Sequence, residues 1–81
     1  MFSDIIGASH LKDLGNEQFK LKNFKKAIEL YTTAIDQDDK DELASIYANR
    51  SACYFNLTMY AEAFRDAKKV IDIEPYWYKG Y

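Results

Sequence analysis

Apolar residues recur every three or four positions along most of this chain, which is the spacing of helices with one buried face. The pattern predicts four helices, at about residues 10–22, 24–35, 42–57 and 59–73. Asn23 and Thr58 precede the second and fourth helices and belong to the residue types that cap helix N-termini. The fourth helix should end before Glu74 and Pro75, because proline disfavours helix at the residue before it. The sequence therefore predicts an all-α fold made of antiparallel helical hairpins.

The second half of the chain repeats the first half at an offset of 36 residues. Five residues recur unchanged at this offset: Phe19, Leu21, Ala27, Ile35 and Asp36 align with Phe55, Leu57, Ala63, Ile71 and Asp72. Other pairs keep their character, as where Gly15 aligns with Ser51 and Phe24 with Tyr60. Small residues that alternate with large ones allow two helices to approach closely and interlock. An ordinary four-helix bundle would explain the helices but not this periodicity, so we favour a repeat protein.

Composition and charge narrow the class of protein. The chain has 81 residues, of which 48% are hydrophobic and 30% charged, with three glycines and one proline, and this suits one small helical domain. A net charge of −2 argues against a nucleic-acid-binding surface, which is usually basic. No apolar run approaches the ~20 residues that span a bilayer, so we expect no membrane association. The N-terminus lacks the features of a signal peptide, and one cysteine forms no internal disulfide, so we expect a cytoplasmic or nuclear protein.

The two halves resemble the tetratricopeptide repeat family, in which helical hairpins stack into a right-handed solenoid. The signature positions that carry the resemblance are Leu11, Leu14, Gly15, Phe24, Ala27, Tyr31 and Ala34 in the first copy, and Tyr47, Ser51, Tyr54, Tyr60, Ala63, Ala67, Val70 and Pro75 in the second. The usual period is about 34 residues, and we place the two additional residues in the acidic stretch Gln37–Asp41. The resemblance implies a single domain over residues 1–81, with a first repeat at 8–41, a second at 44–77 and the start of a third at 78–81.

A narrower resemblance concerns function. The runs Lys12–Phe19, Tyr47–Ala52 and Tyr78–Tyr81 are similar to the carboxylate-clamp subgroup of this family. That subgroup grips the C-terminal Glu-Glu-Val-Asp tail of heat-shock protein 70 or heat-shock protein 90. The resemblance implies that Lys12, Asn16, Asn49 and Lys79 match four of the five clamp residues, while the fifth, an arginine, would fall after Tyr81. We also assign Phe19 and Arg50 to the peptide groove.

The chemistry of these residues agrees with that role. Lys12 and Asn16 are four residues apart and share one helix face, and stacking of the repeats should bring Asn49 beside them. Ammonium groups and carboxamide N–H groups form strong, charge-assisted hydrogen bonds with carboxylates. Each residue has a plainer explanation alone: a solvated lysine, a local cap, a contact between repeats or a residue of the chain end. Their joint occurrence at matching positions favours the clamp.

The two ends of the sequence raise a question of association. Residues 76–78 are read either as an exposed recognition patch or as the first core residues of a third repeat. A solenoid needs a capping helix with a polar outer side, and none follows the second repeat. We therefore expect this open end to be covered in a longer protein or by self-association. Phe2, Ile5 and Ile6 form a short apolar face that would dock on the first repeat or on a neighbour.

The sequence contains no pattern that is typical of a catalytic, metal-binding or cofactor-binding site. His10 is the only histidine, and it has no second ligand nearby. Cys53 lies within a helix among small and aromatic residues, which is typical of a buried, unreactive thiol. The acidic run Asp38–Glu42 is interpreted as a solvated loop. We expect a non-enzymatic adaptor, without a cofactor, that binds an acidic peptide tail. The alternative is a scaffold that docks another protein surface, or itself, through apolar contacts.

Overall fold

The computed structural model describes residues 7–37 and 40–73 of the chain. These residues form four helices, α1 (Ala8–Lys20), α2 (Phe24–Asp36), α3 (Lys40–Asn56) and α4 (Tyr60–Ile73). Every helix that the apolar periodicity predicts is present, so the all-α fold is confirmed. The expectations for Phe2, Ile5 and Ile6, for Lys79 and for a third repeat at 78–81 lie outside the described residues.

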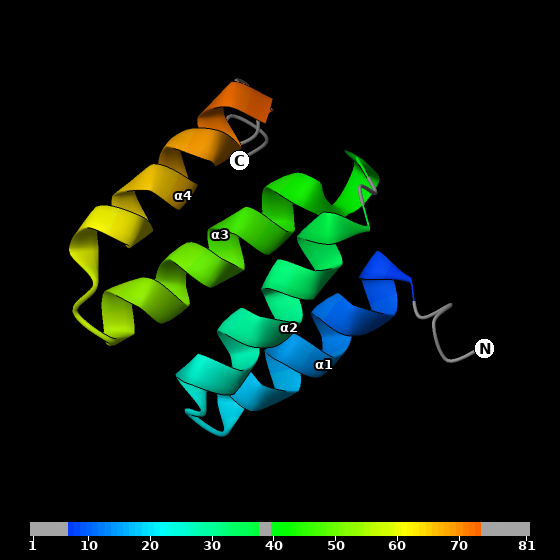
Figure 1. Cartoon of the computed structure of the whole chain (residues 1–81), viewed down its shortest axis with the longest axis horizontal. Coiled ribbons are helices and arrows are strands. Elements are labelled where there is room, and N and C mark those ends of the chain that lie inside the picture. Colours follow the sequence, from blue (N-terminus) through cyan, green and yellow to red (C-terminus); the bar gives the residue numbers. More distant parts are fainter. Residues whose placement is uncertain (1–6, 38–39, 74–81) are drawn as a thin grey trace.

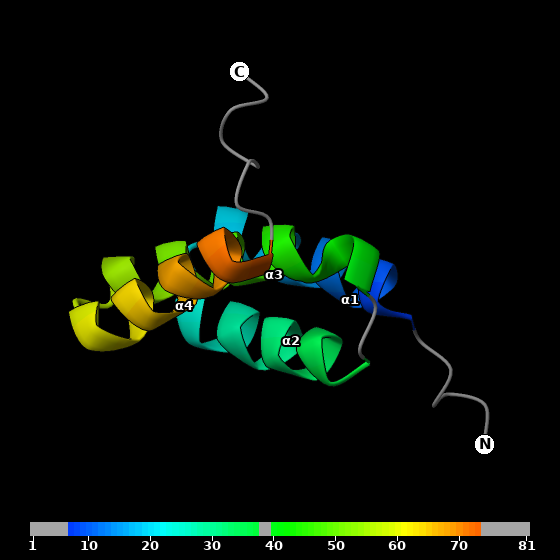
Figure 2. The same cartoon turned by 90° about the horizontal axis from the view of Figure 1, so that it is seen from above.

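The helices form two antiparallel hairpins that stack side by side (Figure 1). α1 pairs with α2, α3 pairs with α4, and α2 also packs against α3. Seen from above, α1 and α3 lie in one layer and α2 lies in the other (Figure 2). α1 and α3 are in contact, so the first helices of the two repeats are neighbours in space. Side chains on the seam between these two helices can therefore act on the same ligand.

The core lies between the first hairpin and α3. It consists of buried side chains from three helices: Leu11, Ala27, Tyr31, Ala34, Ile46 and Cys53. The internal repeat is visible in the packing around this core. Phe19 and Phe24 meet edge to face with their ring centroids 5.3 Å apart, and the equivalent Phe55 and Tyr60 meet at 5.4 Å. The same aromatic pair therefore joins the two helices of each hairpin at the closed end.

The turns of the two hairpins share one hydrogen-bond pattern. Lys22 and Thr58 both adopt the left-handed backbone conformation, with φ angles of 63° and 60°. The Asn23 N–H donates to the Gln18 carbonyl at 2.8 Å, and the equivalent Met59 N–H donates to the Tyr54 carbonyl, also at 2.8 Å. This is the Schellman arrangement that commonly ends a helix, here without its usual glycine.

The capping roles expected for Asn23 and Thr58 are wrong in detail. Asn23 occupies the N-cap position of α2, but its side chain makes no cap bond and instead donates to Gln18 Oε1 at 3.0 Å. Thr58 is the left-handed residue of its turn, and the Met59 carbonyl accepts the first bond of α4, from the Ala63 N–H at 3.0 Å. The tight turn therefore uses these residues for backbone geometry rather than for side-chain capping.

Replacing Thr58 by glycine should increase the free energy of unfolding by about 0.5–1 kcal/mol. A left-handed conformation costs an L-residue ~1–2 kcal/mol, more than the ~0.5–1 kcal/mol of backbone entropy that glycine loses on folding. Urea denaturation measures the change. Thr33→Gly is the matched control, because Thr33 lies in α2 and the same substitution there should cost about 0.5 kcal/mol. A Thr58→Gly variant that is no more stable than wild type would contradict this account.

Candidate functional site

The side chains of Asn16 and Asn49 meet across the seam between α1 and α3. The Asn49 Nδ2 group donates a hydrogen bond to Asn16 Oδ1 at 3.0 Å. The hydroxyl group of Tyr31, which comes from α2, donates to the same oxygen. Three helices therefore converge on one carboxamide, and two of the residues that were expected to hold a carboxylate lie side by side.

Tyr31 is fully buried, and its place depends on Gly15. A Cβ atom added to Gly15 would lie 2.6 Å from Tyr31 Cε1 and 2.8 Å from Cδ1, so only glycine leaves room for the ring. Burial raises the pKa of Tyr31 to about 12. The hydroxyl group, which any tyrosine keeps protonated at neutral pH, therefore remains a hydrogen-bond donor to Asn16 in alkaline solution as well.

A hollow of about 320 Å³ opens beside this cluster. Its lining residues are Asn16, Phe19, Lys20, Tyr31, Asn49 and Ala52. Phe19, which was assigned to the peptide groove, thus lines the same hollow as the two asparagines. Lys20 was not expected there, although it lies four residues after Asn16 on the same face of α1, a spacing that could have identified it. The hollow combines carboxamide groups, an ammonium group and an aromatic ring, which suits an anionic peptide end.

Lys12 lies one turn before Asn16 on α1, but its ammonium group already has a partner. Lys12 Nζ lies 2.8 Å from Glu42 Oε1 and donates to Ser45 Oγ at 3.4 Å, both in α3. Both side chains of the ion pair are about a quarter exposed, and Lys12 does not line the hollow. The ammonium group of Lys12 is therefore already paired with a carboxylate of the chain itself in this structure.

Arg50 is directed away from the hollow. Its guanidinium group binds the buried Asp66 of α4 through two hydrogen bonds, Nε to Oδ2 at 2.7 Å and Nη2 to Oδ1 at 2.9 Å. Its third group, Nη1, donates to Thr32 Oγ1 of α2 at 2.9 Å, and hydrogen bonding to Asp66 raises the pKa of Arg50. Consecutive helix residues point about 100° apart, so Arg50 and Asn49 cannot serve the same face. In this structure Arg50 joins α2, α3 and α4, and its assignment to the peptide groove stays a prediction.

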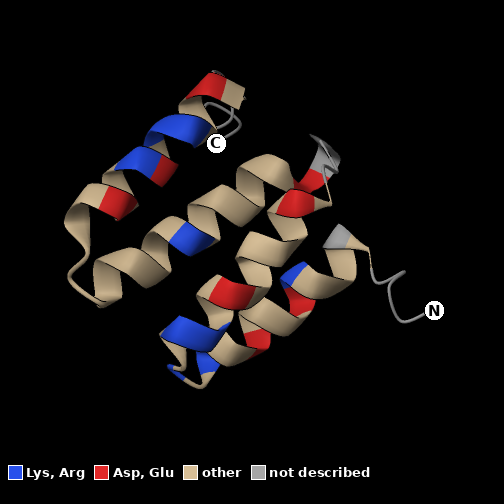
Figure 3. Ribbon diagram, viewed as in Figure 1, with Lys and Arg blue, Asp and Glu red and all other residues tan. Residues whose placement is uncertain are grey.

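Other chemistry is sparse in the part of the chain that the structure describes. Within residues 7–37 and 40–73, no group of three or more His, Cys, Asp or Glu residues could hold a metal ion. Cys53 is buried as expected, and this burial raises the pKa of its thiol to about 11. Lys and Arg occur on all four helices and are interspersed with acidic residues (Figure 3). Among the described helices, none has the length and apolar character needed to cross a membrane.

Comparison with known proteins decides the family. A family model described as serine/threonine-protein kinase BSK1-like, TPR repeats, matches residues 2–81. The chain belongs to this tetratricopeptide repeat (TPR) family. The TPR chain is 42% identical over 76 residues to "Heat shock protein STI1" of Saccharomyces cerevisiae, a match that covers 94% of the chain and 13% of the relative.

Two further relatives carry similar names. The TPR chain is 40% identical over 74 residues to "Hsp70-Hsp90 organizing protein" of Triticum aestivum, covering 91% of the chain and 12% of the relative. It is 41% identical over 76 residues to "Hsp70/Hsp90 co-chaperone CNS1" of Saccharomyces cerevisiae, covering 91% and 20%. The chain thus spans between 12% and 20% of the length of these relatives. No solved structure matches it.

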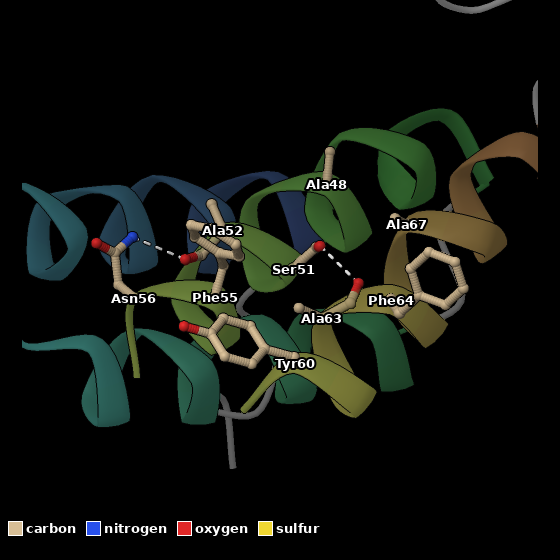
Figure 4. Close-up of a pocket in the computed structure, with 9 residues that line it drawn as sticks. All are labelled: Ala48, Ser51, Ala52, Phe55, Asn56, Tyr60, Ala63, Phe64 and Ala67. Carbon is tan, nitrogen blue, oxygen red and sulfur yellow. Dashed lines mark hydrogen bonds between the residues drawn. The ribbon is translucent and has the colours of Figure 1, made fainter. Parts of the chain in front are cut away.

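The second TPR hairpin carries a larger, apolar hollow of about 470 Å³ between α3 and α4 (Figure 4). Its lining residues are Ala48, Ser51, Ala52, Phe55, Asn56, Tyr60, Ala63, Phe64 and Ala67. Within it, Ser51 Oγ donates to the Ala63 carbonyl at 2.7 Å. The 36-residue offset maps this hollow onto the face of the first hairpin that packs against α3.

Exposure differs sharply between the two equivalent faces. Phe64 is 79% exposed, whereas its counterpart Ile28 is partly buried against the core. None of the described helices covers Phe64. Because TPR repeats bury their apolar faces against one another, this face has the character of a repeat-to-repeat contact rather than of a ligand site.

Proposed function

We propose that this TPR module is an adaptor that binds an acidic peptide tail ending in Glu-Glu-Val-Asp, as heat-shock protein 70 and heat-shock protein 90 present it. The observation that carries the proposal is the pair Asn16 and Asn49, whose carboxamides meet at the hollow between α1 and α3. The names of its relatives, Hsp70-Hsp90 organizing protein and Hsp70/Hsp90 co-chaperone, support it. The role is one of binding rather than of catalysis, and it belongs in the cytoplasm, with the nucleus as the alternative.

The hollow can receive a carboxylate through N–H donors. Within the described residues Asn16 Nδ2 makes no hydrogen bond, because the bonds from Tyr31 and Asn49 use only the oxygen of this carboxamide. Asn49 and Lys20, a residue that carries an ammonium group, line the same hollow. Such donors bind a carboxylate with about twice the strength of a neutral hydrogen bond. The ring of Phe19 would pack against the apolar valine of the tail.

Lys12 would contribute to peptide binding by exchanging the carboxylate of Glu42 for a carboxylate of the peptide. In the unliganded structure its ammonium group is paired with Glu42 at 2.8 Å. A peptide carboxylate must displace Glu42 or share Lys12 with it, so Glu42 competes with the ligand. In this proposal Lys79 would supply the remaining cation, although it lies outside the described residues.

Titration of a synthetic peptide ending in Glu-Glu-Val-Asp should show binding that depends on Asn49 and Lys12. Asn49→Ala and Lys12→Ala should each weaken it about tenfold or more, since a hydrogen bond to a charged group contributes ~1.5–3 kcal/mol. Glu42→Gln should strengthen binding, because it removes the competing carboxylate. Isothermal titration calorimetry measures the three changes, and affinity should fall as the salt concentration rises.

The controls isolate the carboxylate and the position of the charge. The same peptide with an amidated C-terminus should bind markedly more weakly to the wild-type chain. Lys25→Ala removes one exposed positive charge from α2, away from the hollow, and should leave binding nearly unchanged. If the free and the amidated peptides bind equally, the module does not recognise the C-terminal carboxylate.

A second candidate function is a scaffold that docks a protein surface, or another copy of itself, through the α3–α4 face. The observation that favours it is the exposure of large apolar side chains there, with Phe64 79% and Ile71 57% exposed. The peptide titration separates the two functions, because a scaffold of this kind would be indifferent to the Glu-Glu-Val-Asp peptide and to both alanine substitutions.

A further inference from the structure

We propose that Tyr31 is a positioning residue for the carboxylate site. Its buried hydroxyl group holds the side-chain oxygen of Asn16 inward, so that the N–H groups of Asn16 face the hollow. This inference rests on the proposed function and adds to the site a residue that does not itself touch the ligand. It also gives a reason for the glycine at position 15, which makes room for the tyrosine ring.

With Asn49 in its present orientation, the hydrogen bonds around Asn16 fit one orientation of the Asn16 carboxamide. Its Oδ1 atom accepts from the Tyr31 hydroxyl group and from Asn49 Nδ2, which lies 3.0 Å away. A carboxamide oxygen has two lone pairs, and both are used here. If the group were rotated by 180°, its NH₂ group would face the NH₂ group of Asn49, and two donors would oppose each other.

This orientation decides whether the hollow attracts or repels an anion. With the oxygen inward, both N–H bonds of Asn16 remain free for a carboxylate. With the oxygen outward, a carbonyl lone pair would face the negative charge. The Tyr31 hydroxyl group therefore acts on the ligand through Asn16, by holding the donor side of the amide toward the hollow.

Tyr31 is well suited to hold another side chain still. It is fully buried, its ring lies against Gly15, and a Cβ atom there would come within 2.6 Å of the ring. The hydroxyl group is protonated at neutral pH, as an ordinary tyrosine is, and burial raises the pKa of Tyr31 further, to about 12. A rigid ring that ends in a permanent donor gives Asn16 little freedom to turn.

The second repeat supplies an internal comparison. At the 36-residue offset, Asn16 aligns with Ala52 and Tyr31 aligns with Ala67. The amide and the hydroxyl group that orients it are both present in the first hairpin and both missing from the second. This is the pattern expected if the tyrosine hydroxyl group serves the asparagine.

Tyr31→Phe tests the inference, because it keeps the ring and removes only the hydroxyl group. We expect the free Glu-Glu-Val-Asp peptide to bind about fivefold more weakly, in line with the loss of one neutral hydrogen bond. The amidated peptide should bind wild type and variant alike. Tyr54→Phe, the same change on α3 beside Arg50, is the matched control and should leave both affinities unchanged.

A double-mutant cycle with Asn16→Ala separates positioning from general stabilisation. If Tyr31 acts through Asn16, Tyr31→Phe should have no further effect on affinity in the Asn16→Ala background. An equal loss in both backgrounds would overturn the inference, as would unchanged affinity of Tyr31→Phe for the free peptide. Without ligand, the ¹⁵N side-chain resonances of Asn16 should shift and broaden in Tyr31→Phe, and unchanged resonances would also overturn it. If wild type fails to distinguish the free from the amidated peptide, the proposed function itself is wrong and this inference fails with it.

Discussion

Replacing Asp66 by alanine should lower the free energy of unfolding by about 3 kcal/mol or more. Asp66 is buried and receives both Nε and Nη2 of Arg50, at 2.7 and 2.9 Å. Its removal leaves a largely buried guanidinium group without a counter-ion, and breaking a buried ion pair in this way typically costs ~3–5 kcal/mol. A chain of this size has a total stability of about 4–12 kcal/mol, so urea denaturation should show a large loss.

Companion variants show whether the loss comes from the buried pair. Asp72→Ala removes an exposed carboxylate from the same helix and should change stability by less than ~0.5 kcal/mol. Arg50→Lys keeps the charge but loses the two parallel hydrogen bonds, so it should be intermediate. The double variant Arg50→Met with Asp66→Leu should recover much of the stability, since apolar residues of similar size can replace a buried pair. Equal effects of Asp66→Ala and Asp72→Ala would contradict a buried, stabilising pair.

Gly15→Ala should destabilise the fold by about 2 kcal/mol, although alanine is the better helix former by ~1 kcal/mol. The new Cβ atom would lie 2.6 and 2.8 Å from two ring carbons of Tyr31, closer than real contacts allow. The ring is fully buried and cannot withdraw, and forced overpacking of a core costs ~1–3 kcal/mol. Denaturation in urea measures the loss, and the same variant should bind the Glu-Glu-Val-Asp peptide more weakly because the tyrosine hydroxyl group moves.

The second repeat suggests the control for this substitution. Where the first hairpin pairs Gly15 with Tyr31, the second pairs Ser51 with Ala67, so a Cβ atom is tolerated once the opposing ring is absent. In a Tyr31→Leu background, Gly15→Ala should therefore be neutral or stabilising. A loss of the same size in both backgrounds would mean that the clash with the ring is not the cause.

Much of the architecture was predictable because it depends on local order. The spacing of apolar residues identified all four helices, and the 36-residue offset identified two equivalent hairpins. The hairpin repeat also explains why Asn16 and Asn49 could be expected together, since stacked repeats place their first helices side by side. The caps were less predictable, because Asn23 and Thr58 have the right residue type but serve a turn with a left-handed residue.

Other features could not be read from residue type and spacing. Arg50 follows Asn49 directly, yet it serves a different face of α3, where its partner Asp66, 16 residues further along the chain, comes from α4. Glu42 was interpreted as part of a solvated acidic run, whereas in the structure its carboxylate forms an ion pair with the ammonium group of Lys12. Tyr31 was identified as a signature position of the repeat, while its hydrogen bond to Asn16 was not foreseen.

The order of residues along the chain thus established the helices, their pairing into repeats and the presence of amide and ammonium groups on the first helix of the first repeat. These follow from periodicity, which each helix carries independently of its neighbours. The packing of the helices against one another determined which polar groups meet. Asn49 and Tyr31 both donate hydrogen bonds to the side-chain oxygen of Asn16. Glu42 forms an ion pair with Lys12, and Asp66 forms one with Arg50. A hydrogen bond requires atoms to lie about 3 Å apart, and at that scale the rotation and separation of the packed helices select the partner.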